Sequence, residues 1–448
     1  MPNRKFLIVS KYGEILDLAL WLQDVEHEDV TFCVTNDENK KIGLGLVKKS
    51  DTWMQFMGQG CVWVFDGCED GKLQDWLRSK GEAVFGGSEK GDRLENDRQL
   101  GQRLFKRAGF KQPESKNFTD LGDALKFVED NDDKRWILKQ NGSAPKHLNH
   151  MGKFEGNIDL LYHLECLKKS WNEADYGKFD CDLMEVVEGT EVAASAFFNG
   201  EDWMRNEDGK VVGFINCENK KECDGDMGAT TGEMGTVILG CDEDNTLFED
   251  ILLRPEIGEA LKEAGFRGVF DINGCLLDDG DFVAFEATAR IGVPIGAYIL
   301  EDGLETNAAD LMEAVARGEQ VDVEVGRQVA VIMVMASRPF PIEANLEDDQ
   351  TSTGERLWLL KNDGQPHDEM TAEQRRRIKL YNFFKDDDDS LKVATESGYM
   401  LTVSGYGDTV EEAREDAKEF AKENLYLPGM KWRQDLGYKI EDFMDEMV

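Results

Sequence analysis

Strand-like and helix-like segments alternate along the first 95 residues, and this alternation limits the possible folds more than any other feature of the chain. The expected strands span residues 4–9, 30–34 and 61–65, and the expected helices span residues 15–22 and 73–80. Helices between strands favour a parallel sheet, because a parallel connection must cross the sheet and needs many residues to do so. The sequence therefore predicts a parallel α/β domain over residues 1–95.

The remainder of the chain mixes strands and helices without visible repeats. Expected helices are 94–112, 117–130, 256–266, 307–317 and 409–424, and expected strands are 135–139, 181–198 with a turn at Glu188-Gly189, 268–277, 281–288, 329–336 and 399–404. Residues 224–235 are rich in Gly and Thr and are expected to form a loop. Residues 344–395 are acidic and are interpreted as insertion loops and solvated surface. An acidic metal site at Asp386–Asp389 is the alternative interpretation.

The charge of the chain restricts its partners. Its 448 residues carry 91 acidic and 52 basic side chains, a formal net charge of −39. A field of this sign repels nucleic acid backbones and anionic membranes, so we expect no direct binding to either. An anionic nucleotide would need magnesium and a local basic pocket. The plainer interpretation of the charge is solubility.

The nine cysteines are scattered and odd in number, and no CxxC pair occurs. This pattern indicates free thiols in a reducing compartment rather than disulfides or a zinc site. The longest apolar run, Val329–Ala336, is too short to span a bilayer. A soluble cytoplasmic protein is expected.

The segment from Phe282 to Gly292 carries the clearest chemical pattern. A strand-like run ends at Glu286, and Thr288 and Arg290 follow at alternate positions. Alternation places these three side chains on one face of an extended segment. Two oxygen donors and a guanidinium suit a magnesium–triphosphate, because Mg²⁺ takes oxygen ligands and arginine binds phosphate as a fork. The alternative is a buried strand whose polar face meets solvent.

The order of these features resembles the ATP-grasp superfamily, and more closely the glycinamide ribonucleotide synthetase (phosphoribosylamine–glycine ligase) family. A strand ending in Lys139 comes first. A strand–Glu-Gly–strand unit, a Gly/Thr-rich loop and Glu-x-Thr-x-Arg then follow. Further similar segments are Ser115–Thr119 with Ala124-Leu125, Val331–Ala336, Gly398–Ala413 and Arg433–Gly437. The resemblance covers nearly the whole chain. It implies an ATP-grasp fold of the α/β class, with an N-terminal parallel α/β domain (1–95), an ATP-grasp region (96–325) whose nucleotide lid spans about 116–190, and a C-terminal α+β domain (326–448) with the acidic insertion.

The resemblance also implies roles for individual residues. Lys139 would reach the α-phosphate, backbone groups around Glu185 and Val187 would hold adenine, and Glu191 would bind the ribose. The alternative interpretations are that Lys139 is a surface lysine at a strand end and that the Glu188-Gly189 turn belongs to a hairpin with exposed acids. The other implied residues are Lys220 and Lys221 for the phosphates, Gly228, Thr231, Gly232 and Gly235 for the substrate, Glu286, Thr288 and Asn273 for magnesium, and Lys220 with Arg290 for catalysis.

Several positions depart from the family pattern. The family's Gly-Gly-Arg-Glu-His loop, which meets the phosphate of phosphoribosylamine, is replaced by Ser10–Glu14, where Lys11 is the one cation beside Glu14 and Asp17. The glycine-rich lid loop is replaced by Asn141–His147. Asp226–Gly235 reads Asp-Met-Gly-Ala-Thr-Thr-Gly-Glu-Met-Gly where the family has Asp-Thr-Gly-Pro-Asn-Thr-Gly-Gly-Met-Gly, and Thr288 stands in place of a metal-binding asparagine.

Two functions therefore remain open at this point. One is an ATP- and Mg-dependent ligase that joins the carboxylate of an amino acid such as glycine to an amine through an acyl phosphate, with the amine acceptor changed. The other is a pseudoenzyme that keeps the fold for nucleotide sensing, structure or partner binding.

Overall fold

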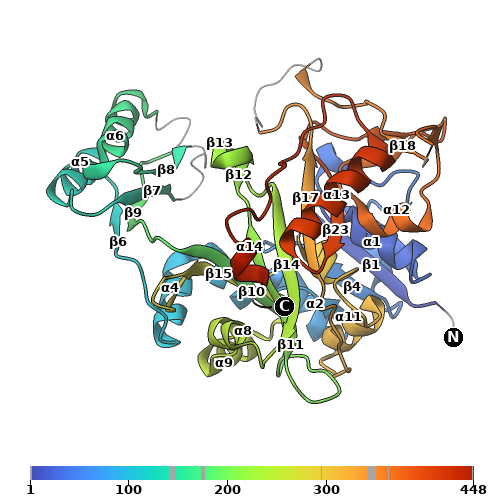
Figure 1. Cartoon of the computed structure of the whole chain (residues 1–448). Helices are drawn as coiled ribbons and strands as arrows, with labels where there is room; N and C mark the ends of the chain where they lie inside the picture. The colour runs from blue at the N-terminus through green and yellow to red at the C-terminus, as the bar shows by residue number, and fades with distance from the viewer. Residues whose placement is uncertain are drawn as a thin grey trace. The chain divides into compact units, whose positions relative to one another are not determined.

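The computed structural model describes residues 3–141, 148–172, 177–293, 295–341, 350–361, 363–445 and 447. The chain divides into two units. Unit 1 comprises residues 1–108, 191–274 and 286–448, and unit 2 comprises residues 109–190 and 275–285. Figure 1 shows the elements of each unit.

The N-terminal part of unit 1 is the expected parallel α/β structure. Its five strands lie in the order β3-β2-β1-β4-β5, and every pair is parallel. The strands are β1 (Lys5–Ser10), β2 (Asp29–Val34), β3 (Lys48–Lys49), β4 (Val62–Phe65) and β5 (Ala83–Phe85), and the helices are α1 (Leu16–Asp24), α2 (Gly71–Ser79), α3 (Glu89–Asn96) and α4 (Arg98–Arg107). Strand order reverses beside β1, so the loops after β1 and β4 flank the position where open α/β sheets bind ligands.

An eight-stranded sheet forms much of the rest of unit 1, although Thr190 of β10, residues 275–276 of β15 and residues 282–285 of β16 are counted in unit 2. Its order is β16-β15-β10-β11-β14-β17-β23-β20, with antiparallel neighbours from β10 to β20. The strands are β10 (Thr190–Asn199), β11 (Val212–Glu218), β14 (Gly235–Asp242), β15 (Arg267–Leu276), β16 (Phe282–Thr288), β17 (Val329–Ala336), β20 (Ile378–Leu380) and β23 (Tyr399–Gly407). β17 is buried along its whole length, because α13 packs on it and on β23.

The helices of this part begin and end at residues with clear capping roles. Thr409 accepts a hydrogen bond from the N–H of Glu412 and so begins α13, and Pro255 begins α9, which Gly265 ends with a positive φ. The helices are α8 (Thr246–Leu252), α9 (Pro255–Ala264), α10 (Ile295–Ile299), α11 (Ala308–Arg317), α12 (Ala372–Arg377), α13 (Val410–Asn424) and α14 (Glu441–Asp445).

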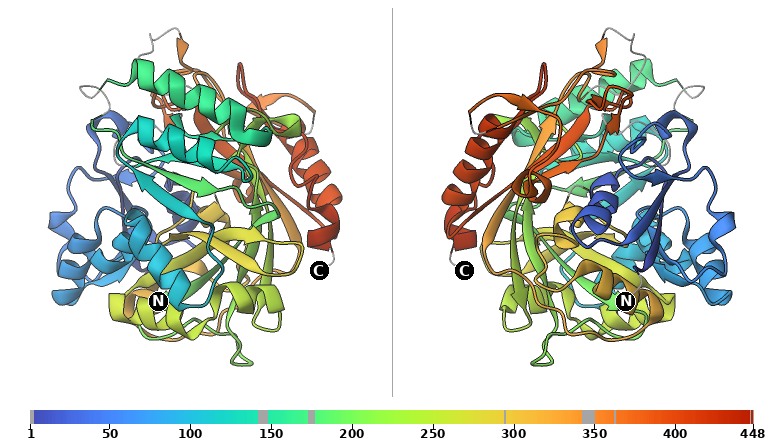
Figure 2. Two further views of the ribbon diagram at one scale, coloured as in Figure 1. Left: turned by 90° about the vertical axis from the view of Figure 1, so that its left-hand side faces the viewer. Right: turned by 90° about the vertical axis from the view of Figure 1, so that its right-hand side faces the viewer.

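Unit 2 is a small α+β structure with its own core. Strands β6 (Ser115–Phe118), β7 (Trp136–Gln140), β8 (His150–Met151) and β9 (Cys181–Glu185) form an antiparallel sheet in the order β6-β9-β7-β8. Two helices, α5 (Leu121–Asp130) and α6 (Ile158–Ser170), cover one face of this sheet (Figure 2). Asp120 accepts hydrogen bonds from the N–H groups of Gly122 and Asp123, which fixes the start of α5.

Three sequence predictions about elements were wrong. The helix expected at 94–112 breaks at Asp97, which caps α4 by accepting from the N–H of Leu100. The loop expected at 224–235 contains β13 (Met227–Thr230), which pairs with β12 (Lys221–Cys223). The region 344–395 is not irregular where the structure describes it. Besides α12 and β20, it contains β18 (Trp358–Leu360), which pairs with β24 (Leu425–Tyr426), together with β19 (Pro366–His367), β21 (Phe383–Lys385) and β22 (Leu391–Val393).

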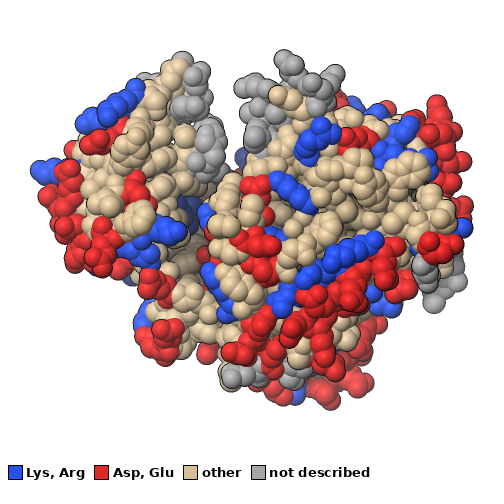
Figure 3. Space-filling model, turned by 45° about the horizontal axis from the view of Figure 1, so that its top comes forward, with Lys and Arg blue, Asp and Glu red and all other residues tan. Residues whose placement is uncertain are grey.

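Charge is spread widely over the surface. Figure 3 shows Asp and Glu side chains over much of one face, with Lys and Arg between them. In the proposed acidic metal segment, Asp386 accepts from Lys392 at 2.5 Å and Asp389 pairs with Lys385 at 3.0 Å. Within the described ranges, no group of three or more His, Cys, Asp or Glu side chains is arranged to hold a metal ion. Over the same ranges, no helix has the length and apolar character needed to cross a bilayer.

Candidate functional site

Charged side chains converge on Lys220 at one end of the large sheet of unit 1. Glu218 ends β11 and lies 3.3 Å from the Lys220 ammonium, and both side chains are partly exposed. Burial lowers the pKa of Lys220, but Glu218, Glu286 and Glu191 outweigh it, so that the pKa of Lys220 is raised. One lysine therefore shares the field of three carboxylates.

Two further carboxylates belong to this cluster, and sequence reasoning missed both. Burial and then the charges of Glu218 and Glu286 raise the pKa of Asp271, a half-buried residue of β15, well above its usual range. Burial and the charge of Glu218 also raise the pKa of Glu233, a residue that is 4% exposed, well above its usual range. Within the part of the chain that the structure describes, the Glu233 Oε1 has no hydrogen-bond partner.

The three residues predicted to bind magnesium lie on the two neighbouring strands β15 and β16. Glu286 is exposed and Thr288 half-buried, as the alternation predicted. Asn273 donates its side-chain N–H to the Asp271 carboxylate, so its amide orients a carboxylate two residues away on the same face of β15. The chemistry fits a hard divalent cation, because the carboxylates of Glu286 and Asp271 and the hydroxyl of Thr288 are all oxygen donors. Asp271 is a better candidate ligand than Asn273.

Arg290 does not point freely to solvent. Its Nε donates to Glu95 Oε1 at 2.9 Å, while the Ala289 N–H donates to the other oxygen of Glu95 at 3.0 Å. Burial lowers the pKa of Arg290, but the nearby acids Glu95, Cys68 and Glu14 together raise it. Its guanidinium is thus fixed by α3.

The Gly/Thr segment is a hairpin that continues from Lys220. Thr231 donates both its N–H and its hydroxyl to the Lys220 carbonyl, at 2.8 and 2.9 Å, and Lys221 donates its ammonium to the Thr230 hydroxyl at 2.8 Å. Gly228 is exposed with a φ of 80°.

The last part of this segment packs against other strands of unit 1. A Cβ on Gly232 would lie 3.3 Å from the Tyr399 hydroxyl, and one on Gly235 would lie 2.6 Å from the Ile332 carbonyl, which explains glycine at 235. Tyr399 also accepts from the N–H of Glu233 at 2.7 Å and donates to its carbonyl.

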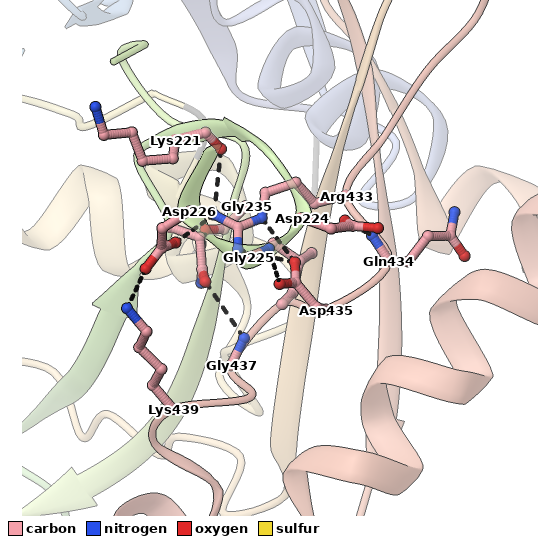
Figure 4. Close-up of polar contacts among 12 residues, drawn as sticks. Lys221, Asp224, Gly225, Asp226, Gly235, Arg433, Gln434, Asp435, Gly437 and Lys439 are labelled. Carbon is pink, nitrogen blue, oxygen red and sulfur yellow. Dashed lines mark hydrogen bonds and ion pairs between the residues drawn. The ribbon is translucent and has the colours of Figure 1, made fainter. Parts of the chain in front are cut away.

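The base of the hairpin lies against the segment Lys431–Lys439 (Figure 4). Arg433 is 1% exposed, and its guanidinium donates to the carboxylate of Asp226 at 2.9 Å. The sequence showed both segments as similar to the family but gave no signal that they touch, because 207 residues separate the two side chains.

The predicted nucleotide residues of unit 2 occupy the strand ends of its sheet. Lys139 lies in β7, half-buried, with its ammonium 5.8 Å from the centre of the Phe285 ring. The N–H of Glu185 donates to the Glu114 carbonyl at 2.8 Å, and its carboxylate lies 3.3 Å from Lys134.

Val187 follows β9, two residues before Gly189. A Cβ on Gly189 would lie 2.2 Å from the Leu276 carbonyl, so only glycine fits this turn. The family's lid loop corresponds to Asn141–His147, of which residues 142–147 lie outside the described residues.

The loop after β1 is more acidic than the sequence indicated. Lys11 forms an ion pair with Glu69. Ser10 donates its hydroxyl to Asp66 at 2.5 Å, and burial raises the pKa of Asp66 to about 7. The expected place of Asp17 beside Lys11 was wrong. Its side chain is 3% exposed and interacts electrostatically with Glu301, because this first-turn residue of α1 faces inward.

Comparisons with known proteins relate the chain to named enzymes. No family model matches the chain. The phosphoribosylamine–glycine ligase of Helicobacter pylori is 23% identical over 99% of this chain and 98% of its own length. The chloroplastic phosphoribosylamine–glycine ligase of Arabidopsis thaliana is 24% identical over 82% of this chain and 65% of its own length.

The solved structures show the fold. The phosphoribosylamine–glycine ligase of Thermotoga maritima superposes with a TM-score of 0.68 at 21% identity, covering 96% of this chain and all of that one. The biotin carboxylase domain of Hydrogenobacter thermophilus 2-oxoglutarate carboxylase, solved with MgADP, has a TM-score of 0.63 at 11% identity and covers 96% of this chain and 92% of its own. The chain therefore has the ATP-grasp fold and resembles phosphoribosylamine–glycine ligases, as predicted.

Proposed function

We propose that the protein is an ATP-dependent carboxylate–amine ligase. The observation that carries the proposal is the convergence of Lys220 with Glu218, Asp271 and Glu286 at the end of the large sheet, in a chain that resembles phosphoribosylamine–glycine ligases along its length. The relatives that the chain matches along most of its length are named as ligases, which favours the enzyme over the pseudoenzyme.

The residues divide the work as follows. Glu286 and Asp271, with Thr288, would hold magnesium, which neutralises phosphate charge when bound. Lys220 and Lys221 neutralise the phosphoryl group as it passes to the carboxylate of an amino acid such as glycine. The proposed nucleotide-binding residues are Lys139 and residues 185–190 in unit 2 and Glu191 in unit 1. The chemistry needs positioning and charge neutralisation more than a protein nucleophile.

The second step forms the amide. The amine attacks the carbonyl carbon of the acyl phosphate, and the carbon–oxygen bond to phosphate breaks. The nitrogen gives up one proton, which leaves with the phosphate. The products are the amide, ADP and phosphate. Nine free cysteines support a reducing compartment, so we place this reaction in the cytoplasm.

Hydroxylamine trapping tests the proposal. A wild-type protein with Mg-ATP and a panel of amino acids should convert one of them to its hydroxamate, because hydroxylamine captures an acyl phosphate without the natural amine. Lys220→Met should abolish this product. Lys210→Met is the matched control, since Lys210 has similar exposure and also pairs with one carboxylate, Asp244. No hydroxamate from any amino acid with the wild-type protein would refute ligase chemistry.

A further inference from the structure

The segment Lys431–Lys439 is attached along the base of the hairpin that carries Lys220 and Lys221. Both main-chain and side-chain groups form this attachment, and all of these contacts lie within unit 1. The contacts are Lys431 with Glu222, Gln434 N–H to Asp224 at 2.8 Å, Gly225 N–H to Asp435 at 2.7 Å, Gly437 N–H to Asn219 at 3.4 Å, and Lys439 with Asp226.

Arg433 is the centre of this attachment. Its guanidinium donates to the carbonyl of Lys221 at 3.2 Å, to Asp226 at 2.9 Å and to Asp435 at 2.9 Å (Figure 4). A buried guanidinium needs partners of this kind, because an unpaired charge away from water is strongly unfavourable. The pairing leaves the Asp226 carboxylate bound on both sides, by Arg433 and by Lys439.

The hairpin needs such support at this point. Gly225 and Asp226 have φ angles of 67° and 55°, two successive left-handed residues that turn the chain from β12 toward β13. Asp226 is not glycine, so its left-handed backbone costs energy that a local interaction must offset. The two cations on its side chain supply that interaction.

The same attachment controls the two lysines. The carbonyl of Lys220 accepts from Thr231, within the hairpin, while the carbonyl of Lys221 accepts from Arg433. Consecutive peptide groups are therefore fixed, one from inside the hairpin and one from the C-terminal segment. Fixing both carbonyls fixes the direction in which each side chain leaves the backbone. The ion pair of Lys220 with Glu218 and the hydrogen bond of Lys221 to the Thr230 hydroxyl then hold the two ammonium groups.

We propose that Arg433 is a positioning residue for the phosphoryl-transfer step. Through the Lys221 carbonyl and Asp226, Arg433 holds Lys220 and Lys221 in place. The inference rests on the proposed function. Arg433 does not touch the reacting atoms. The C-terminal segment acts on the chemistry only through the hairpin.

The test combines turnover with hydrogen exchange in the full-length protein. Arg433→Met should lower the kcat of hydroxamate formation by about tenfold to a hundredfold, as expected when reacting groups are misplaced by about 1 Å. The KM for Mg-ATP should change far less. Amides of residues 219–235 should exchange faster than in the wild type, while those of β17 should not.

A second variant covers the case in which removal of the buried arginine prevents folding. Lys439→Met alters a side chain that is 61% exposed and should show the same two effects in weaker form. Its matched control is Lys262→Met, because Lys262 is 58% exposed and pairs with Glu201 away from the hairpin. Arg433→Lys should restore part of kcat, since it keeps the charge but loses the fork.

The outcomes separate cleanly. Unchanged exchange over 219–235 in both variants overturns the inference, and so does a fall in kcat no larger than that of Lys262→Met. A wild-type protein that makes no hydroxamate refutes the proposed function and, with it, the role of Arg433 in phosphoryl transfer. In that case the exchange data still decide whether the segment holds the hairpin.

Discussion

Freeing Lys11 from Glu69 should improve the use of a phosphorylated amine. In the family that the chain resembles, the loop after the first strand offers arginine and histidine to the phosphate of phosphoribosylamine. Here that loop offers Lys11, and the structure pairs it with Glu69. One neighbouring lysine, Lys49, is already engaged elsewhere. Lys49 donates to the Ile42 carbonyl at 2.5 Å, and burial lowers its pKa to about 8.

The magnitude follows from the partners. Lys11 and Glu69 are 40% and 64% exposed, so their pair contributes less than about 1 kcal/mol and Glu69→Gln should leave the fold intact. A freed Lys11 can make one charge-assisted bond to phosphate, worth roughly 1.5 kcal/mol at an exposed site. This predicts a gain of about tenfold in kcat/KM for phosphoribosylamine. The wild type, lacking two such bonds, should fall about a hundredfold or more below an enzyme that keeps the motif.

Steady-state kinetics with freshly generated phosphoribosylamine, glycine and Mg-ATP measures both values. Asp37→Asn is the control, because it removes one exposed acid that also pairs with a lysine, Lys40, without freeing Lys11. Equal gains from Glu69→Gln and Asp37→Asn would mean that net charge alone matters. A wild-type specificity constant within about tenfold of the motif-bearing enzyme would refute the reasoning about the loop.

Four further outcomes are expected. Mg-ATP at a hundredfold excess over its Kd should stabilise the protein by about 2.7 kcal/mol in thermal shift and calorimetry, and no shift in either would contradict the nucleotide site. Glu286→Gln should reduce metal-dependent turnover more than it reduces ATP binding, measured by magnesium titration of rate and of affinity, because a charged ligand is lost. Thr288→Asn should preserve or raise activity in the same assays; loss of activity would show that Thr288 has another role. Folding raises the pKa of Asp66 to about 7, so the folded state keeps a proton that the unfolded chain releases near pH 4. Stability from this group is present below about pH 4 and is lost as the pH rises to about 7, and Asp66→Asn should flatten that part of the pH profile in urea denaturation.

Much of the framework could be predicted because local patterns determine it. The strands and helices expected before residue 95 lie close to their expected bounds. The apolar run Val329–Ala336 is the strand β17. The acidic region 344–395 was misjudged for the same reason. Its strands are only two or three residues long, so their buried residues, such as Leu359 and Phe383, leave no periodicity among many charges.

The site was harder to predict because it depends on contacts between distant segments. Asp271 and Asn273 lie on one face of β15. Asn273 was chosen by its sequence distance from Glu286, but that distance depends on the length of the turn between β15 and β16. The sequence could not tell that Asp271 is the residue of the carboxylate cluster. Glu233 looked like a polar residue in a loop. Only the packing of the hairpin against Tyr399 shows that it is buried.

Lys220 and Lys379 of unit 1 both lie among carboxylates, and exposure separates their roles. Lys379 lies against Glu301 and Asp302, and all three side chains are 3% exposed or less, so no dissolved ligand reaches them. Lys220 is 34% exposed beside Glu218, and Glu286 of the same cluster is exposed. A cation from solution can therefore reduce the repulsion among the carboxylates around Lys220. Around Lys379, only bound protons and contacts within the protein can reduce it. Of these two clusters, only the one around Lys220 can bind a metal–nucleotide and thereby reduce the repulsion among its carboxylates. This is the reason to look for catalysis there.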